Sequence, residues 1–244
     1  MSSAPQSMRK KPSGGVAKGY QLARKRQTRV AALAALLAML LLGCLVTSTT
    51  AAAATRLAAF GDSLTAGYGL PAGDAFPARL EQALAARGRD VTIANFGVSG
   101  DTTAGGLARL DQVLSMRPDG VIVELGANDM LRGQDPETAM ANLDAILKRL
   151  TGAGIPVLLC GMRSAKNYGA DYAAEFDAIY PALAKRYDAA LYPFLLDGVT
   201  GHPDLTLPDG LHPNARGVGE IVARILPTAE AFVDKLGNTA AARP

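Results

Sequence analysis

Short apolar runs alternate with longer stretches of helical pattern along most of this chain, and this alternation limits the folds that it can adopt. Five apolar runs are predicted to be strands: residues 56–60, 91–96, 120–125, 156–160 and 189–192. Five stretches between or after them are predicted to be helices: roughly residues 76–87, 104–116, 136–153, 171–186 and 213–235. Strands that are apolar throughout and separated by helices are typical of a parallel sheet covered on both faces. The sequence therefore predicts an α/β fold of three layers, α/β/α, around a five-stranded parallel sheet.

The residues at the ends of the third predicted helix agree with its boundaries. Asp135 followed by Pro136 is a typical N-cap and first helical residue, and Gly152 and Gly154 mark the end of the same helix. With 244 residues, 49% of them apolar, the chain is long enough to bury one sizeable core. It shows no internal repeat and no linker, so residues 55–237 are predicted to form a single domain, followed by a frayed tail at 238–244.

The first 54 residues differ in composition from the rest of the chain. They contain eight Lys and Arg residues and no Asp or Glu, and the last of these bases, Arg29, precedes an apolar run over residues 30–46. Small residues follow up to Ala54, a layout typical of a bacterial export signal, which predicts a periplasmic or secreted protein. Two alternatives remain open. They are an uncleaved membrane anchor, because the 17-residue run approaches the length of a membrane span, and a lipoprotein modified at Cys44.

The remainder of the chain is acidic, with 17 basic and 22 acidic side chains and a net charge of −5. It has no polybasic stripe, which argues against nucleic acid as a partner. Cys160 ends an apolar run, and we expect it to be a small buried side chain rather than a nucleophile. No cluster of Cys and His residues is available to hold a metal ion.

Two segments carry the residue types of nucleophilic catalysis. Ser63 lies in FGDSL (residues 60–64), at the turn after the first predicted strand, and ligands bind at the carboxyl ends of strands in open α/β sheets. His212 lies in DGLH (residues 209–212), where Asp209 can accept from the imidazole N–H. The next residue, Pro213, is predicted to be the first residue of the final helix. Taken alone, Ser63 also fits a turn and His212 a loop histidine, while the other histidine, His202, has no comparable setting.

Two further segments follow the second and third predicted strands. Gly100 lies in GVSGDT (residues 97–102), where Asp101 or Thr102 can cap the next helix, and its N–H is a candidate anion donor. Asn128 lies in ELGAND (residues 124–129), and its amide is a candidate donor to an oxyanion. Each segment also fits ordinary turn chemistry. The G-x-S-x-G elbow of the α/β-hydrolases is absent, which favours a flavodoxin-like sheet over the fold of that family.

Taken together, these segments resemble the four blocks of the GDSL or SGNH hydrolases, in the same order and with similar spacing. The four blocks are FGDSL at 60–64, Gly100, GAND at 126–129 and DGLH at 209–212. Other segments resemble the branch of the periplasmic acyl-CoA thioesterase/lysophospholipase and the related arylesterases: GLARL at 106–110, VELG at 123–126, LRG at 131–133, NYG at 167–169 and IYP at 179–181. The resemblance covers essentially all of residues 56–235.

This resemblance implies the SGNH hydrolase fold and a serine esterase that acts on carboxylic ester or thioester bonds. It also implies the site residues. Ser63 is then the nucleophile, His212 the base, and Asp209 the residue that orients the base. The backbone N–H groups of Ser63 and Gly100 and the side chain of Asn128 form the oxyanion hole. The family resemblance requires no metal and no other cofactor.

The acyl substrate stays open among a lysophospholipid, an acyl-CoA, an aryl ester and an acylated sugar. Residues 163–172 are expected to form part of the acyl-binding rim, and the NYG segment within them resembles the thioesterase/arylesterase branch. Ala127 departs from the family, where glycine is common, and its methyl group would narrow the acyl entrance. A different class of function, a non-catalytic surface binding module on a hydrolase scaffold, is disfavoured by the intact set of Ser, His and Asp. Membrane contact is expected only through the N-terminal segment, if that segment is not cleaved.

Overall fold

The computed structural model describes residues 54–241, and the side chains of residues 54–237 other than that of Lys166. Five strands form one parallel sheet in the order β2-β1-β3-β4-β5. The strands are β1 (Thr55–Gly61), β2 (Val91–Gly97), β3 (Gly120–Glu124), β4 (Val157–Cys160) and β5 (Ala190–Tyr192). Each predicted strand agrees with an observed one to within one residue at either end, so the five-stranded parallel sheet is confirmed.

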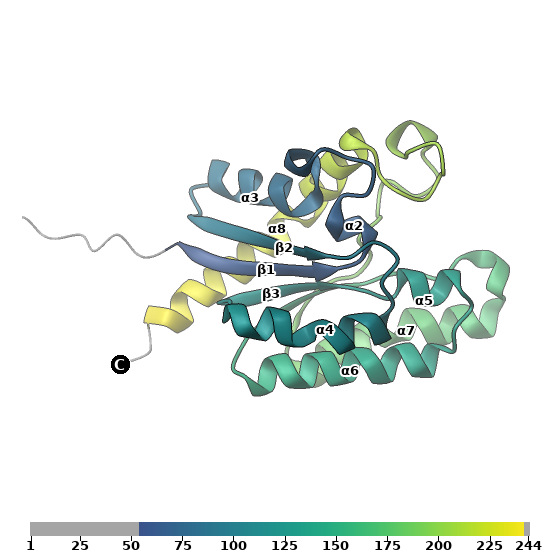
Figure 1. Cartoon of the computed structure of the whole chain (residues 1–244), viewed down its shortest axis with the longest axis horizontal. Helices are drawn as coiled ribbons and strands as arrows, with labels where there is room; N and C mark the ends of the chain where they lie inside the picture. The colour runs from purple at the N-terminus through teal and green to yellow at the C-terminus, as the bar shows by residue number, and fades with distance from the viewer. Residues whose placement is uncertain (1–53, 242–244) are drawn as a thin grey trace, which may run out of the picture. The chain divides into compact units, whose positions relative to one another are not determined.

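Helices cover both faces of this sheet, which gives the three predicted layers (Figure 1). They are α2 (Ser63–Ala66), α3 (Phe76–Ala86), α4 (Thr103–Met116), α5 (Ala127–Leu131), α6 (Pro136–Gly152), α7 (Ala170–Tyr187) and α8 (Ala215–Ala241), with short 3-10 turns at Ala72–Asp74, Lys166–Tyr168 and Pro203–Leu205. On one face α8 packs against α3, and on the other α6 packs against both α4 and α7.

The burial of the strands explains why they read as continuous apolar runs. Every residue of β3 and β4 is buried, and so are the last five residues of β1. Side chains such as Ile122 and Leu158 are covered completely although neighbouring residues point to opposite faces. β2 lies at the edge of the sheet, and of its seven residues only Val91 and Ile93 are buried. The apolar core therefore sits on both sides of the central strands β1, β3 and β4.

The final helix begins at Ala215, and the prediction that Pro213 is its first residue is wrong. Pro213 instead pairs with Thr206 in an isolated antiparallel bridge. Asn214 caps the helix, because its Oδ1 accepts from the backbone N–H groups two and three residues further on, both at 3.0 Å. An asparagine cap satisfies free N–H groups at the helix start, and this capping decides the boundary.

The other predicted helix caps are present. Thr102 caps α4 by accepting from the N–H of Gly105 at 3.2 Å, and Asp135 caps α6, with Pro136 as the first helical residue. Two helices were not predicted, α2 with four residues and α5 with five. Both are too short to show a helical period in the sequence, and both directly follow a strand of the sheet centre.

The register of the sheet brings three strand ends together. Gly61, at the end of β1, pairs with Gly97 of β2 on one side and with Glu124 of β3 on the other. Since all strands are parallel, the segments that follow these three residues leave the sheet at the same edge. Each of those segments carries one of the residues singled out in the sequence: Ser63, Gly100 or Asn128.

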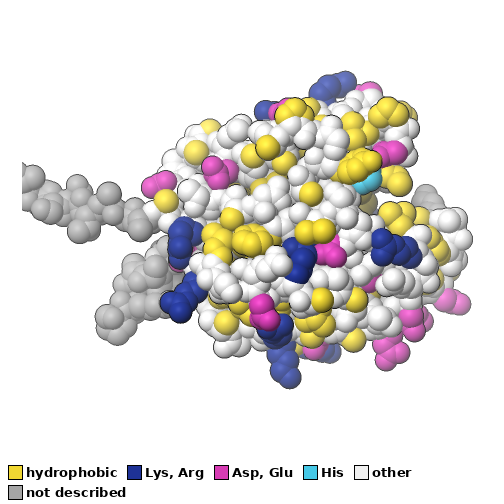
Figure 2. All heavy atoms as spheres, viewed as in Figure 1, with side chains coloured by type: hydrophobic (Ala, Val, Ile, Leu, Met, Phe, Trp, Pro, Cys, Tyr) yellow, Lys and Arg dark blue, Asp and Glu magenta, His cyan; other side chains and the backbone are white. Residues whose placement is uncertain are grey.

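The export signal or anchor predicted over residues 1–54 lies outside the described residues, apart from Ala54. Residues 242–244 of the tail predicted to be frayed also lie outside them, while α8 continues to Ala241. Among residues 54–241, no helix combines the length and the apolar character that crossing a membrane requires. On the face shown in Figure 2, Lys and Arg side chains are scattered among acidic ones and form no continuous patch.

Candidate active site

Ser63 is the first residue of α2, the short helix that directly follows β1. Asp62 caps this helix, because its Oδ1 accepts from the N–H of Leu64 at 3.0 Å. The first N–H groups of a helix have no acceptor within the helix, so the N–H of Ser63 is available to a partner outside it. The residue as a whole is only 8% exposed. The turn therefore presents one hydroxyl and one free backbone donor at the edge of a buried structure.

The structure places His212 and Asp209 beside Ser63, although 149 residues separate the serine from the histidine. Nε2 of His212 lies 2.9 Å from Oγ of Ser63, and Nδ1 lies 2.7 Å from Oδ2 of Asp209. A carboxylate next to Nδ1 holds the proton on that nitrogen, which leaves Nε2 of the neutral ring as an acceptor. The three side chains thus form a continuous chain of hydrogen bonds from carboxylate to hydroxyl.

The Asp209 carboxylate is held in its ionised form by its own loop. Its Oδ1 accepts from the backbone N–H groups of His212 at 3.0 Å and of Leu211 at 2.9 Å. These backbone hydrogen bonds, together with the bond from the His212 ring, lower the pKa of Asp209 to about 2. An ionised Asp209 is the form that stabilises a protonated imidazole.

Further contacts hold the His212 loop and the Ser63 turn, and the ring of Tyr68 joins the two. Leu207 donates its N–H to the carbonyl of His212 at 2.7 Å, and Tyr68 donates its N–H to the carbonyl of Ser63 at 3.1 Å. The ring of Tyr68 then lies against the ring of His212, with 4.5 Å between centroids and 37° between planes. Tyr68 therefore restricts the movement of the imidazole ring.

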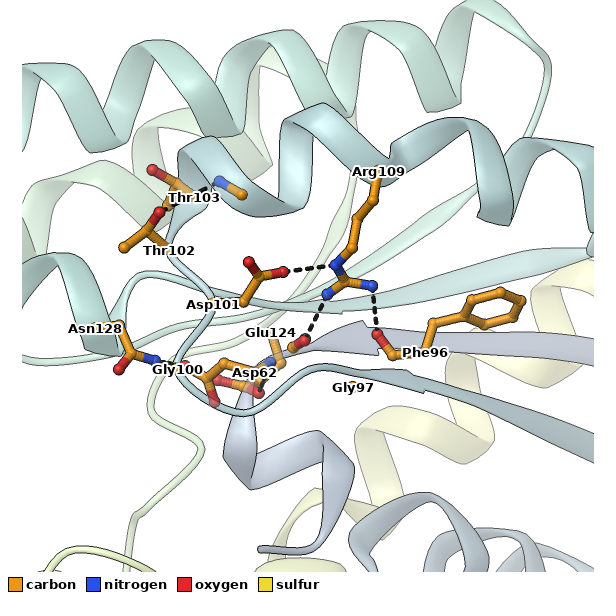
Figure 3. Close-up of polar contacts among 12 residues, drawn as sticks. Asp62, Phe96, Gly97, Gly100, Asp101, Thr102, Thr103, Arg109, Glu124 and Asn128 are labelled. Atoms are coloured by element: carbon orange, nitrogen blue, oxygen red, sulfur yellow. Dashed lines mark hydrogen bonds and ion pairs between the residues drawn. The ribbon is translucent and has the colours of Figure 1, made fainter.

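Gly100 lies in the loop between β2 and α4, with φ of 82°, in the left-handed region that favours glycine. Arg109 of α4 holds this loop, as Figure 3 shows. Its Nε lies 2.5 Å from Oδ2 of Asp101, and its two Nη atoms donate to the carbonyls of Phe96 at 2.7 Å and Gly61 at 2.8 Å. One guanidinium thus fixes the ends of β1 and β2 and the residue that follows Gly100.

Asn128 lies in α5, and its Nδ2 donates to Oδ2 of Asp62 at 3.0 Å (Figure 3). The next residue, Asp129, is fully buried and accepts from the N–H and the hydroxyl of Thr103, at 2.8 and 2.6 Å. This pair of bonds ties the start of α5 to the start of α4. The Asn128 amide is therefore anchored to the residue immediately before Ser63.

The carboxyl side chains of Asp62 and Glu124 lie behind the edge of the sheet where Ser63 stands, and both are fully buried. Burial raises the pKa of Asp62 to about 6. Burial, and after it the charge of Asp62, raises the pKa of Glu124 well above its usual range. Oε2 of Glu124 accepts from the Thr65 hydroxyl at 2.8 Å, whereas Oε1 has no hydrogen-bond partner among the described residues.

The five residues singled out in the sequence meet at one edge of the sheet. Ser63, His212 and Asp209 are joined directly. Asn128 reaches the Ser63 turn through Asp62, and the carbonyl of Gly100 accepts from Arg132 at the end of α5, at 2.8 Å. His202 lies on an exposed turn before the 3-10 segment Pro203–Leu205. Cys160 is buried, as predicted.

Sequence reasoning missed the side chains that hold these residues: Asp62, Arg109 and Glu124. Glu124 left a signal, since it is the one charged residue in the apolar run 120–125, and buried charges need a partner. Asp62 and Arg109 carried no such signal, because their partners are set by strand order. Within the part of the chain that the structure describes, no group of three or more His, Cys, Asp or Glu side chains is placed to hold a metal ion.

Comparison with known proteins gives consistent matches over this region. The model of the GDSL-like lipase/acylhydrolase family matches residues 59–218, a range that contains all five residues above. The arylesterase of Vibrio mimicus is 41% identical over 195 residues, covering 78% of this chain and 96% of that protein. Esterase TesA of Pseudomonas aeruginosa is 40% identical over 194 residues, with coverage of 78% and 96%. The crystal structure of AlinE4, an SGNH-hydrolase family esterase, matches with a TM-score of 0.63 and 49% identity, covering 74% of this chain and 97% of that chain.

Proposed function

The chain belongs to the GDSL-like lipase/acylhydrolase family and is a serine esterase, and we propose that Ser63, His212 and Asp209 carry out its reaction. The observation that carries the proposal is the hydrogen-bonded relay, with 2.9 Å from Ser63 Oγ to His212 Nε2 and 2.7 Å from His212 Nδ1 to Asp209 Oδ2. The bond that breaks is a carboxylic ester or thioester bond, and the reaction passes through an acyl-enzyme on Ser63.

In the first half of the reaction, Oγ of Ser63 attacks the carbonyl carbon while its proton passes to Nε2 of His212. A serine hydroxyl is a weak nucleophile at its own pKa, so it needs this base. The imidazolium that forms is stabilised by the ionised Asp209 on its other nitrogen. The tetrahedral intermediate then collapses as His212 returns the proton to the leaving alcohol or thiol. Water repeats the same steps on the acyl-enzyme and releases the carboxylic acid.

Three donors are proposed to stabilise the oxyanion of the tetrahedral intermediate: the backbone N–H groups of Ser63 and Gly100 and the side-chain amide of Asn128. The position of Ser63 at the start of α2 supports the first, since that N–H has no partner within the helix. The hydrogen bond from Asn128 to Asp62 uses one of the two amide N–H groups and leaves the other for the substrate. Preorganised donors of this kind stabilise charge without reorganising during the reaction.

An apolar acyl group is the proposed substrate class, of the arylesterase, thioesterase or lysophospholipase type. The large hydrophobic side chains that stay exposed on the described part are Tyr68, Val98, Leu131 and Leu211. Each stands within five residues of Ser63, Gly100, Asn128 or His212 in the sequence. Exposed apolar side chains gathered beside a reactive site favour an apolar ligand. Nucleic acid is not proposed as a partner, because the chain after residue 54 carries a net charge of −5 and no polybasic stripe.

The N-terminal segment supports a proposal on location. Basic residues, an apolar run over 30–46 and small residues up to Ala54 together favour export from the cytoplasm. N-terminal sequencing of the protein from the periplasm or the medium tests this. A start near Ala54 or Thr55 is expected; a start at Met1 contradicts cleavage, and a start at Cys44 carrying a lipid identifies a lipoprotein instead.

A fluorophosphonate probe and short-chain p-nitrophenyl esters test the proposed chemistry. The wild-type protein should bind the probe covalently and hydrolyse the ester, while Ser63→Ala should do neither and should keep its circular dichroism spectrum. Asn128→Ala should lower kcat by about 10²–10³ if its amide is an oxyanion donor.

Matched histidine variants complete this test. His212→Ala should abolish turnover, whereas His202→Ala should leave it near the wild-type value. Turnover retained by Ser63→Ala would refute the assignment of the nucleophile. A wild-type protein that neither reacts with the probe nor hydrolyses any ester of the panel would instead fit a binding module.

A further inference from the structure

Two buried carboxyl groups lie directly behind Ser63, and the steps described above use neither of them. Asp62 and Glu124 are both 0% exposed. Glu124 ends β3 opposite Gly61 of β1, so its side chain lies beneath the turn that leads to Ser63. Burying one ionised carboxylate costs several kcal/mol, and burying two side by side costs more. Such a pair therefore needs an explanation in terms of its partners.

The contacts of the pair indicate that one member carries a proton. Oε2 of Glu124 accepts from the N–H of Asp62 at 3.3 Å and from the hydroxyl of Thr65 at 2.8 Å, so the two fully buried residues are in direct contact. The charge of Asp62 also raises the pKa of Glu124. Two ionised carboxylates buried this close together would repel each other, so one member of the pair must be the neutral acid.

The surroundings assign that proton to Glu124. Asp62 already accepts from the Leu64 N–H and from the Asn128 amide, and both bonds favour its ionised form. Burial and the charge of Asp62 raise the pKa of Glu124 well above its usual range. Both carboxyl oxygens of Asp62 accept from donors, whereas Oε1 of Glu124 is buried and accepts no hydrogen bond from any described residue, so it is the oxygen that can carry the proton.

Other titratable groups around the pair do not change this assignment. The pair interacts electrostatically with Cys160 of β4, Tyr180 of α7 and His212. Arg109 of α4 bonds to the Gly61 carbonyl next to the pair, and Asp129 of α5 interacts with Tyr180. Burial raises the pKa of the Cys160 thiol and of the Tyr180 phenol, so both stay neutral. Asp129 is occupied by two bonds from Thr103. A protonated His212 favours the ionised form of Asp62 and so leaves the proton on Glu124.

We propose that Glu124 is a positioning residue which, as a neutral acid, donates to Asp62 and holds the Asp62 carboxylate between the Ser63 turn and the Asn128 amide. This inference rests on the proposed role of Asn128 in the oxyanion hole. Asp62 uses Oδ1 to cap α2 and Oδ2 to hold one N–H of Asn128, so its orientation fixes two of the three proposed oxyanion donors at once. Loss of the Glu124 hydrogen bond frees Asp62 to rotate and releases the amide.

Two substitutions at Glu124 separate this role from simple filling of the core. Glu124→Gln keeps a donor for Asp62 and an acceptor for Thr65 without changing the charge of a neutral acid. Its kcat should stay within about threefold of wild type, and the acid limb of its pH profile should not move. Glu124→Met has a similar volume but can neither donate to Asp62 nor accept from Thr65. Its kcat should fall about 10- to 100-fold, which is part of the cost of losing an oxyanion donor. Its KM should change little.

Cys160→Ala is the matched control, because Cys160 pairs with Glu124 across β3 and β4 and makes none of these hydrogen bonds. Its kcat should match wild type. A fall of more than tenfold in Glu124→Gln, or a displaced acid limb, would show that Glu124 acts as a charged group and would overturn the proposal. The Gln variant keeps the test decisive even if Glu124→Met does not fold.

A double-mutant cycle tests whether Glu124 acts through Asn128. In an Asn128→Ala background, Glu124→Met should lower kcat less than threefold further, because the amide that it positions is already absent. Full additivity of the two effects would overturn the positioning role while leaving the oxyanion hole intact. An Asn128→Ala variant with wild-type kcat would instead remove the proposed function on which this inference rests.

Discussion

Arg109 holds the loops around Ser63, and replacing it should damage stability and turnover together. Its guanidinium joins three acceptors from separate segments: the Asp101 carboxylate and the carbonyls of Phe96 and Gly61. A lysine carries the same charge but presents it as a single point, so it cannot satisfy three acceptors in different directions. Arg109→Met removes all three bonds and keeps much of the aliphatic volume.

The size of the effect follows from the contacts that are lost. Hydrogen bonds to charged groups contribute about 1.5–3 kcal/mol each, and breaking one partner of a buried ion pair costs about 3–5 kcal/mol. The side chains of Arg109 and Asp101 are 13% and 14% exposed, so water replaces part of the loss. We therefore expect Arg109→Met to lower the free energy of unfolding by about 3 kcal/mol, or Tm by roughly 6–12 °C for a domain of this size. Arg109→Lys should lie between this variant and wild type.

Turnover should fall as well, because the lost bonds lie next to proposed oxyanion donors. The Gly61 carbonyl lies two residues before Ser63, and Asp101 follows Gly100 directly. Misplacing a catalytic group by about 1 Å costs on the order of 10² in rate. The kcat of Arg109→Met, measured well below its Tm, should therefore fall between about 10- and 100-fold, with a smaller change in KM.

Urea unfolding and p-nitrophenyl ester hydrolysis measure the two effects separately. Arg79→Met is the matched control, because Arg79 pairs with Asp74 at 3.6 Å and its side chain is 41% exposed. Surface pairs of this kind contribute at most about 1 kcal/mol, and kcat should not change. A loss of less than 1 kcal/mol in Arg109→Met, or a wild-type kcat, would refute the idea that this guanidinium holds the two loops.

Three further outcomes are expected from the observed contacts. Asn214→Ala removes the cap of α8 and should lower the free energy of unfolding by about 1 kcal/mol in urea titrations. The pKa of Asp209 is lowered to about 2 from 3.8, so its contribution to stability is present above pH 4 and is lost as pH falls towards 2. Asp209→Asn should flatten the curve of urea midpoint against pH in that window. The pKa of Asp62 is raised to about 6 from 3.8, so stability present below pH 4 is lost as pH rises through 6, and Asp62→Asn should remove that loss.

The sheet could be predicted from the sequence because strands that are buried on both faces are apolar at nearly every position. β3 and β4 are apolar at every position but Glu124, and glycines and prolines bound the helices beside them. The start of α8 was misplaced because two rules competed there. Pro213 suits a first helical turn, but Asn214 supplies a side-chain acceptor, and Pro213 is used in the bridge to Thr206. α2 and α5 were not predicted, because four or five residues are too few to show a helical period.

The candidate site, like the fold, could be predicted only in part. Ser63, Asp209, His212, Gly100 and Asn128 could be singled out from residue type and from their places after strands, and their catalytic roles stay predictions. Among the side chains that hold them, Glu124 stands out as the one charged residue of its apolar run. The contacts of Glu124 and Arg109 could not be predicted, because they depend on strand order. Glu124 meets the Ser63 turn only because β3 lies beside β1, and Arg109 reaches two carbonyls only because β1 also lies beside β2.

Gly61 shows why the buried carboxyl and the nucleophile turn belong together. A methyl group at this position would meet the Thr65 hydroxyl first and would lie 2.5 Å from both the carbonyl and the Oε2 of Glu124, so only glycine leaves room for the Thr65 and Glu124 side chains beneath the turn. Without Glu124 the same space would be an unfilled gap behind Asp62, and such gaps cost stability. The glycine before Asp62 and Ser63 is thus explained by what lies under the turn as much as by the turn itself. Gly61→Ala should therefore crowd Glu124 and Thr65, whereas Glu124→Met should leave Asp62 without a donor, so both variants should disturb the contacts that hold the Ser63 turn.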